Sequence, residues 1–357
     1  MPQALPDARQ GETLILCPIG LGNFLMATPA LKALSDRLGP EKVSLLALKG
    51  GISDMALASG LFRDVFAWDP DKEGVSKGLS LLRRIRGRKF RHSLAFFPSS
   101  HWKFSLFHRL AGADFRMGFA YPHQKAPELV QHVSLSLEDT HDTYQNLRLA
   151  ETFLGSPIQN PGAPFFPLPI QMPSGLPGES FFACHPGSSA ERGMAEKRLA
   201  PEAFAFLIHR VYRATGWRCV LTGGPEEKDL REAVAKDCRE AILPVALRSL
   251  SETAGVLKSA RFFLGNDSGL MHVAAAVGTR CASFFGPTDE KRTGPFGYWE
   301  TVGGATRHLI LRRSGTSPVW TLRTVGSNPP LKEGDASRWN LDLPRAWEEL
   351  KTWITAL

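Results

Sequence analysis

The sequence lacks the features that mark membrane, secreted and nucleic-acid-binding proteins. No apolar run reaches the roughly 20 residues that a transmembrane helix needs. Residues 1–12 hold no basic region followed by an apolar core. There is no short-period repeat, no nucleic-acid-binding module and no aromatic–basic repeat. We therefore expect a cytoplasmic globular protein that has no signal peptide and no nucleic-acid partner.

Cysteine is scarce, and metal-binding patterns are absent. Four of the five cysteines lie in apolar, strand-like runs, and none forms a C-x-x-C pair. This distribution favours reduced core residues over disulfides or zinc ligands. The sequence also lacks a D-x-D motif and any clear metal-ligand cluster, and the Asp-Pro-Asp at 69–71 is typical of a loop. We expect neither a metal ion nor another cofactor.

The charge balance is basic, with 43 lysines and arginines against 35 acidic residues and a net charge of +8. Such an excess suits an anionic partner, for example a membrane surface or a phosphorylated glycolipid. The densest basic stretch is 83–92. It fits contact with anionic lipid headgroups or glycan phosphates, and it also fits a solvated helix end before a strand over 93–97. The sequence leaves both interpretations open.

Predicted strands and helices alternate in both halves of the chain. In the first half, strands are expected over 13–17, 42–48, 65–68 and 93–97, with helices over 24–38, 52–60 and 75–85. In the second half, strands are expected over 181–185, 218–221, 262–264 and 281–285, with helices over 201–215, 227–238 and 250–259. This order predicts an α/β protein with parallel sheets covered by helices.

A proline-rich segment separates the two halves. Residues 156–179 hold seven prolines, a density that indicates an extended connector. We expect a first domain over 1–160, a linker over 161–178 and a second domain over 179–335. Residues 336–357 are expected to end in an amphipathic helix, because Trp347, Leu350, Ile354 and Leu357 share one helical face.

The most informative segment runs from 262 to 272. It predicts a buried strand, a tight turn and the start of a helix, with Asp267 and Ser268 as good N-cap residues and Gly269 permitting close approach of a ligand. A helix start of this kind is a ready anion site. A second strand over 281–285 runs into Gly-Pro-Thr-Asp at 286–289. Two such loops at one sheet edge favour a phosphate-bearing ligand, although each turn alone also fits an ordinary strand-to-helix connection.

These motifs resemble glycosyltransferase family 9, the ADP-heptose:lipopolysaccharide heptosyltransferases. The resemblance is carried by GNDSGLMHVAAAVG (265–278), FFGPTDEKRTGPFG (284–297), ACHPGSS (183–189), KRLAPEAF (197–204), VLTGGPEE (220–227) and LILCPIGLGNFLMATPALKAL (14–34). It implies a GT-B fold, with two Rossmann-like, doubly wound domains facing a central cleft and a C-terminal helix that packs back on the N-terminal domain. It also implies inverting, metal-independent transfer of heptose from ADP-heptose to a lipopolysaccharide-core or related glycan acceptor, with possible peripheral contact at the inner membrane.

The resemblance implies a donor site in the second half. Lys197 matches the family's phosphate-binding lysine, with Arg198 as the alternative because residues 191–196 look like an extension of the loop. Glu226 or Glu227 would accept a hydrogen bond from a ribose hydroxyl, and Asp267 would bind sugar hydroxyls or cap its helix. The candidate donor-binding residues are Ser188, Ser189, Lys197, Gly223, Gly224, Glu226, Asp267, Ser268, Gly269, His272, Thr288 and Asp289.

The acceptor side departs from the family pattern. Gly20 and Gly22 permit close approach of an acceptor, but the position of the family's general base is Asn23, and an amide cannot take a proton. His101 is the first substitute candidate because its unperturbed pKa suits a base. Lys103 is a candidate for an acceptor phosphate, and both residues also fit an ordinary loop. His141 is a weaker candidate that also fits a helix cap.

Three alternative functions remain at this point. The same fold would serve with a different nucleotide sugar. Asn23 instead suggests a catalytically silent nucleotide-sugar-binding or scaffold protein. Non-hydrolysing sugar-nucleotide epimerases share the GT-B fold, but they fit these motifs less well. The acceptor, the nucleotide base and the oligomeric state are left open by the sequence.

Overall fold

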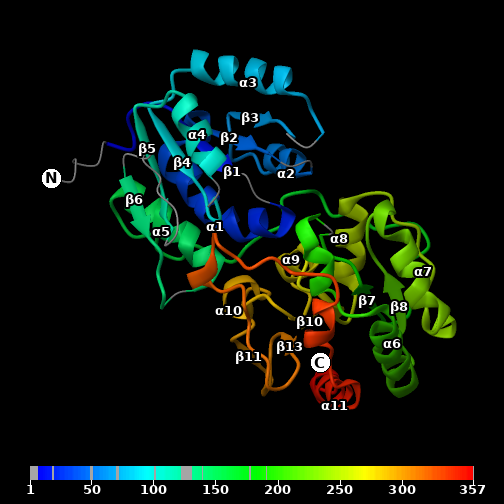
Figure 1. The fold of residues 1–357 in the computed structure, drawn as a ribbon. Helices are drawn as coiled ribbons and strands as arrows, with labels where there is room; N and C mark the ends of the chain where they lie inside the picture. Colours follow the sequence, from blue (N-terminus) through cyan, green and yellow to red (C-terminus); the bar gives the residue numbers. More distant parts are fainter. Residues whose placement is uncertain are drawn as a thin grey trace. The chain divides into compact units, whose positions relative to one another are not determined.

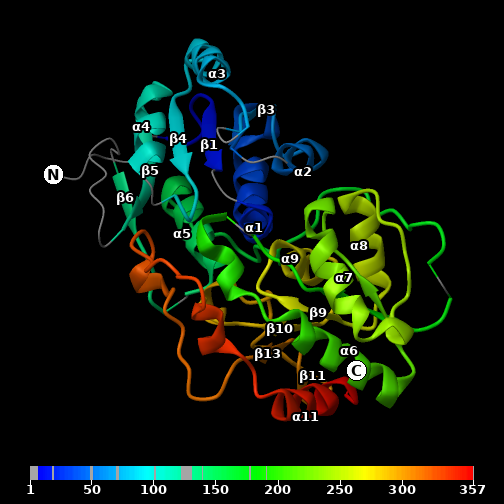
Figure 2. The ribbon, with the colours of Figure 1, turned by 45° about the vertical axis from the view of Figure 1, so that its right-hand side comes forward.

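The computed structural model describes residues 7–17, 20–48, 51–69, 72–99, 102–121, 131–138, 140–176, 178–189 and 191–356. The chain forms two compact units, shown in Figures 1 and 2. Unit 1 comprises Met1–Leu168 and Leu322–Ser327, and unit 2 comprises Pro169–Thr321 and Asn328–Leu357. Each unit is built on one parallel sheet, which confirms the predicted α/β class.

Unit 1 has a six-stranded sheet in the order β3-β2-β1-β4-β5-β6, and every neighbouring pair is parallel. This is the doubly wound order, in which the chain reverses its winding between β1 and β4. The elements are β1 (Thr13–Cys17), α1 (Leu21–Leu38), β2 (Val43–Ala47), α2 (Ile52–Ala58), β3 (Asp64–Ala67), α3 (Val75–Gly87), β4 (His92–Ala95), α4 (Trp102–Leu110), β5 (Phe115–Ala120), β6 (Gln131–Ser134) and α5 (Asp142–Leu154).

The central strands β1 and β2 are buried along their whole length, as continuous apolar runs in a parallel sheet should be. Leu14, Leu16 and Leu46 pack in one cluster with Leu81 and Ile85 of α3. The helices α1 and α5 pack against each other and contribute no residue to this cluster.

The start of α1 differs from the prediction. The helix begins at Leu21 rather than at Phe24, and the exposed Gly20 is its N-cap. Gly22 and Asn23 therefore belong to the first helical turn instead of a loop. The burial of Phe24, Leu25 and the following apolar residues outweighs the low helix propensity of glycine.

Unit 2 has a five-stranded parallel sheet in the order β13-β10-β9-β7-β8. Its elements are β7 (Phe181–His185), α6 (Pro201–Thr215), β8 (Arg218–Leu221), α7 (Lys228–Lys236), α8 (Leu250–Ser259), β9 (Phe263–Asn266), α9 (Gly269–Ala276), β10 (Cys281–Phe284), α10 (Glu290–Thr293), β11 (Thr301–Val302), β12 (Ala305–Thr306), β13 (Leu309–Leu311) and α11 (Leu343–Ile354). The winding reverses between β7 and β9, which puts the loops after these two strands side by side at one edge.

The C-terminal helix α11 corrects one expectation. The resemblance implies packing on the N-terminal domain, but the apolar face of α11 lies in the core of unit 2. Trp353 contacts the ring of Phe262 at 5.8 Å between ring centroids, and its indole nitrogen donates to the carbonyl of Thr306 at 2.8 Å. Leu350 is fully buried in the same cluster. The predicted apolar face is thus confirmed at Trp347, Leu350 and Ile354, while Leu357 lies outside the described residues, and the helix packs on the neighbouring α6 and β13.

The proline-rich segment contains no helix or strand between the end of α5 at Leu154 and the start of β7 at Phe181, in the part that the structure describes. The boundary between the units falls within it, between Leu168 and Pro169. A feature that the sequence did not suggest is the inclusion of Leu322–Ser327 in unit 1. Among the described residues, no helix combines the length and the apolar composition required to cross a membrane.

Candidate functional site

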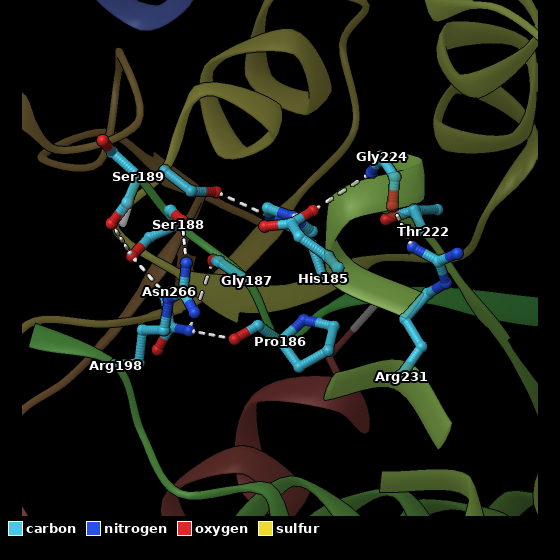
Figure 3. A network of polar contacts seen from close by, with 12 residues as sticks. His185, Pro186, Gly187, Ser188, Ser189, Arg198, Thr222, Gly224, Arg231 and Asn266 are labelled. Atoms are coloured by element: carbon cyan, nitrogen blue, oxygen red, sulfur yellow. Dashed lines mark hydrogen bonds and ion pairs between the residues drawn. The ribbon is translucent and has the colours of Figure 1, made fainter. Parts of the chain in front are cut away.

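The candidate site of unit 2 lies where β7 and β9 end, at the point where the sheet reverses its winding. Loops at such a point are the usual ligand-binding edge of an open parallel sheet. His185 ends β7 and Asn266 ends β9, and the two strands pair directly. Figure 3 shows the polar side chains and backbone groups that meet here.

His185 links two candidate ligand-binding residues. Its Nε2 lies 2.9 Å from Glu227 Oε2, and its Nδ1 lies 3.0 Å from Ser268 Oγ. A carboxylate only accepts hydrogen bonds, so Nε2 carries the hydrogen atom and donates the hydrogen bond to Glu227. In a neutral ring, Nδ1 then accepts from the Ser268 hydroxyl, which leaves the oxygen of Ser268 to accept from a ligand.

The carboxylate of Glu227 is held in its ionised form. Burial raises its pKa, but the hydrogen bonds from His185 and from the backbone N–H of Gly224, with the charge of Arg198, outweigh burial, so the pKa lies below the ordinary value. Oε2 receives both hydrogen bonds, which leaves Oε1 for another partner. Glu226 is exposed and takes no part in this network, so Glu227 is the member of the pair that the structure places in the site.

Two glycines make this close packing possible. A Cβ atom on Gly187 would lie 1.8 Å from Glu227 Oε1 and 2.8 Å from His185 Nε2. A Cβ atom on Gly223 would lie 2.6 Å from Glu227 Oε2, and the φ of +142° at this residue also disfavours a side chain. Gly187 and Gly223 therefore allow the loops after β7 and β8 to enclose the Glu227 carboxylate.

Lys197 and Asp267 form a buried ion pair. The distance between Lys197 Nζ and Asp267 Oδ2 is 3.1 Å, and the two side chains are 10% and 9% exposed. Burial raises the pKa of Asp267, but the charge and hydrogen bond of Lys197, together with a hydrogen bond from Thr288, outweigh burial, so the net pKa lies below the ordinary value. Burial lowers the pKa of His272 to about 4, so its imidazole is neutral at physiological pH.

The N-terminus of α9 is open to an anion. Ser268 is the N-cap, but its hydroxyl bonds to His185 and makes no side-chain cap, and the first turn holds no acidic residue. Asp267 does not cap the helix either, because its carboxylate faces Lys197. Among the residues that the structure describes, no side chain therefore accepts from the N–H groups of the first turn, which begins at Gly269 near the Lys197 cation.

The side chain of Asn266 links the end of β9 to two other segments of the site by hydrogen bonds. The amide of this fully buried side chain donates to the carbonyl of Pro186 at 2.6 Å and accepts from the N–H of Leu199 at 2.9 Å. Arg198 donates from Nε to Ser188 Oγ at 3.2 Å. Asn266 thus fixes the loop that follows β7 and the segment carrying Lys197 relative to the end of β9 (Figure 3).

The loop after β10 contributes Thr288 and Asp289. Asp289 is the N-cap of α10, and its side chain accepts from the N–H of Lys291 at 3.1 Å. Burial raises its pKa. Arg312 follows β13 and lies outside the predicted motif in the sequence. It donates hydrogen bonds to the carbonyls of Gly286 and Thr288 and so stabilises the conformation of the loop.

In unit 1, the predicted acceptor-side residues Gly20, Gly22 and Asn23 lie at the N-terminus of α1. Gly20 is the N-cap without a side-chain hydrogen bond, and Asn23 is half-buried in the first turn. Lys103 lies in the first turn of α4. His101 lies outside the described residues. His141 caps helix α5, as the second interpretation of this residue predicted. Its Nδ1 accepts a hydrogen bond from the N–H of Thr143 at 3.2 Å.

The structure brings most of the predicted donor-site residues to one sheet edge and adds several that were not predicted. Lys197 and Asp267 form an ion pair, His272 is near enough for their charges to affect its pKa, and Ser188 accepts a hydrogen bond from Arg198. Ser189 lies on the exposed side of the same loop. Arg198 was predicted only as the alternative to Lys197. His185 and Asn266 were missed as site residues, although each stands inside a quoted motif and at the polar end of a buried strand, which was a usable signal.

Comparison with known proteins identifies the family of this chain. The profile of glycosyltransferase family 9 (heptosyltransferase) matches residues 79–309. Among curated proteins, the chain is 35% identical over 80 residues to lipopolysaccharide heptosyltransferase 3 of Escherichia coli, which is 21% of this chain and 24% of that protein. The chain thus matches about a quarter of the length of the curated relatives.

Solved structures show the same fold. The structure of the E. coli ADP-heptose LPS heptosyltransferase II aligns with a TM-score of 0.66 at 16% identity, covering 96% of this chain and 98% of that one. An E. coli heptosyltransferase solved with ADP aligns with a TM-score of 0.62 at 17% identity, covering 89% and 96% of the two chains. The fold class is the one predicted from the sequence, and the protein belongs to glycosyltransferase family 9, the heptosyltransferase family.

Proposed function

We propose that this protein transfers a heptose from ADP-heptose to a lipopolysaccharide-core or related glycan acceptor. The observation that carries the proposal is the meeting of Lys197, the uncapped N-terminus of α9 and the Glu227 carboxylate where β7 and β9 end. These groups match the needs of a nucleotide diphosphate, which carries negative phosphates and ribose hydroxyls. Family membership and the names of the relatives favour ADP-heptose as the donor.

In the proposed complex, the pyrophosphate lies against the first-turn N–H groups of α9 and the Lys197 ammonium group. Lys197 would then be shared between the Asp267 carboxylate and the phosphates. Glu227 Oε1 accepts a hydrogen bond from a ribose hydroxyl. Ser188, Ser189, Gly224, Thr288 and Asp289 line the remaining donor surface.

Transfer then follows an inverting displacement. An acceptor hydroxyl oxygen attacks the anomeric carbon from the face opposite ADP, the bond from that carbon to the β-phosphate oxygen breaks, and the hydroxyl proton passes to a base. Negative charge grows on the leaving phosphate, where Lys197 and the helix N–H groups stabilise it. Because the chain supplies these positive groups itself, we expect transfer to continue in the presence of EDTA.

A direct assay tests this function. The purified protein is incubated with ADP-heptose and a panel of lipopolysaccharides truncated in the core, and the products are identified by mass spectrometry. The proposal requires one acceptor to gain the mass of one heptose as ADP is released. If the protein transfers a sugar only from a UDP- or GDP-linked donor, it is still a glycosyltransferase with this fold, but the proposed donor is wrong.

A second function is favoured by one observation. Asn23 lies in the first turn of α1, where the family resemblance implies a carboxylate base. A silent nucleotide-sugar-binding protein would bind ADP-heptose and transfer to no acceptor. The transfer assay and a binding titration, run on the same sample, separate the two functions.

Replacing Asn23 by aspartate tests the role of this position. If the position faces the acceptor hydroxyl, a carboxylate there should raise the transfer rate at least tenfold, because a positioned base commonly contributes about 10²–10⁴-fold. Affinity for ADP should stay unchanged, since the donor residues lie in unit 2. Asn23→Ser is the control, and equal rates for both variants would show that the proton leaves to another group.

Replacing His185 tests how Glu227 is positioned. We expect His185→Phe to weaken ADP binding about tenfold, because both Glu227 and Ser268 lose a hydrogen-bond partner. The informative quantity is the loss of affinity when 3′-deoxy-ADP replaces ADP, measured by calorimetry. This loss should be smaller in the variant than in the wild type. If it is the same in both, His185 does not act through ribose recognition.

A further inference from the structure

The loop extension ahead of Lys197 has no part in the proposed donor site. It forms the 3₁₀ helix η2 (Glu191–Lys197), and the residue directly before the lysine is the half-buried Glu196. Lys197 itself pairs with Asp267. A carboxylate therefore stands beside the cation that is proposed to bind the pyrophosphate, where its charge opposes the binding of an anion.

The Glu196 carboxylate is bonded to a segment that lies 138 positions away in the sequence. Its Oε2 accepts from the N–H of Gly334 at 3.1 Å and from the N–H of Ala336 at 3.2 Å. Both N–H groups lie at the start of the 3₁₀ helix η6 (Asp335–Trp339), where backbone donors have no partner within the helix. Hydrogen bonds to an ionised acceptor are stronger than neutral ones, so Glu196 ties η2 firmly to η6.

The helix η6 is itself fixed to the body of unit 2. Trp339 at its end is 3% exposed and belongs to the core cluster of this unit. A Cβ atom on Gly286, in the loop after β10, would lie 3.1 Å from the Trp339 ring. Arg313, shortly after β13, donates to the carbonyl of Ser337 at 3.1 Å. A segment that is bonded to η6 is therefore bonded to a supported part of the fold.

The backbone is thus held on both sides of Lys197. On the C-terminal side, Arg198 donates to the loop after β7, and the N–H of Leu199 donates to the side chain at the end of β9. On the N-terminal side, Glu196 supplies the contact with η6. A lysine side chain is long and flexible, so the position of its ammonium group depends on how well the adjoining backbone is held.

We propose that Glu196 is a positioning residue for Lys197. Its hydrogen bonds to η6 hold the backbone that precedes the lysine, and they keep its carboxylate occupied away from the ammonium group. The extension at 191–196 thus serves the donor site without touching the donor. This inference rests on the proposed function, because it assigns Glu196 to pyrophosphate binding through Lys197.

Calorimetric titration of the full chain with ADP tests this role. Glu196→Ala should weaken ADP binding at least about fivefold, because a small displacement of a binding group is costly. Loss of a negative charge alone would strengthen the binding of an anion, so the sign of the change separates positioning from charge. Glu196→Gln keeps a side-chain carbonyl that can accept from both N–H groups, and it should restore the affinity of the wild type or exceed it.

A double-mutant cycle separates positioning from a general loss of structure. In the Lys197→Met background, Glu196→Ala should cause no further loss of ADP affinity, because Glu196 acts through the lysine. Glu348→Ala is the matched control. Glu348 is exposed in α11 and has no ion-pair partner among the described residues, so this variant should bind ADP as the wild type does.

Hydrogen exchange gives a readout that needs no ligand. In Glu196→Ala, the N–H groups of Gly334, Ala336 and Leu199 should exchange faster than in the wild type, with α11 unchanged. Absence of ADP binding by the wild type would contradict the proposed function together with this inference. Wild-type binding that Glu196→Ala leaves unchanged or strengthens, or an equal loss in the Lys197→Met background, would overturn the inference alone.

Discussion

Replacing Lys197 by methionine should lower the affinity for ADP and for ADP-heptose at least tenfold. The ammonium group lies 3.1 Å from Asp267 and beside the open N-terminus of α9, where the proposal puts the pyrophosphate. A charge-assisted hydrogen bond to a phosphate contributes about 1.5–3 kcal/mol, which corresponds to a loss of this size or larger. The dissociation constants are measured by calorimetry.

The same substitution also leaves Asp267 without its partner, so stability must be measured alongside binding. Removing one member of a buried pair costs about 3–5 kcal/mol of stability, since the other charge stays buried. The double variant Lys197→Met/Asp267→Asn restores a neutral pair and should recover stability without recovering ADP affinity. Lys236→Met in α7, an exposed lysine, is the control that should change neither. Full ADP affinity in folded Lys197→Met would remove Lys197 from the donor site.

The second large effect is expected at Asn266. Replacing it by alanine removes three hydrogen bonds, to Pro186, Gly187 and Leu199, at a fully buried position. Because buried polar groups without partners cost about 1–3 kcal/mol each, the free energy of unfolding should fall by roughly 4 kcal/mol. Equilibrium unfolding in guanidinium chloride measures the change.

Asn340→Ala, at an exposed position, provides the matched control for Asn266 and should change the free energy of unfolding by less than about 0.5 kcal/mol. We also expect Asn266→Ala to bind ADP more weakly, because the segment that carries Lys197 is held in place by the hydrogen bond from the N–H of Leu199 to the Asn266 side chain. A loss below about 1 kcal/mol would mean that water replaces the amide and that Asn266 does not hold the site together.

The sequence predicts the parts of this fold that depend on local patterns. Continuous apolar runs predicted the buried strands β1, β2 and β10, and the glycine-bearing motif at 265–269 predicted the open helix start of α9. These features are readable because a buried parallel strand and a helix N-terminus each impose residue types over a few neighbouring positions.

The missing parts depend on contacts between distant residues. His185 and Glu227 are 42 positions apart, and nothing in either segment shows that the loops after β7 and β8 meet. The start of α1 was placed too late because glycine disfavours a helix, whereas burial of the following residues decides the matter. The face of α11 was correct and its partner was wrong, since an apolar stripe does not specify the surface that it covers.

The central claim is that the loops after β7, β8 and β9 form a binding site for an adenine nucleotide sugar. Calorimetric titration of the wild-type protein with ADP-heptose, ADP, UDP and GDP, in the presence of EDTA, tests it most directly. We predict binding of ADP and ADP-heptose at one site, weaker binding of UDP and GDP, and loss of the ADP signal in Lys197→Met. Absence of binding to all four ligands, or ADP binding that Lys197→Met leaves unchanged, would contradict the account.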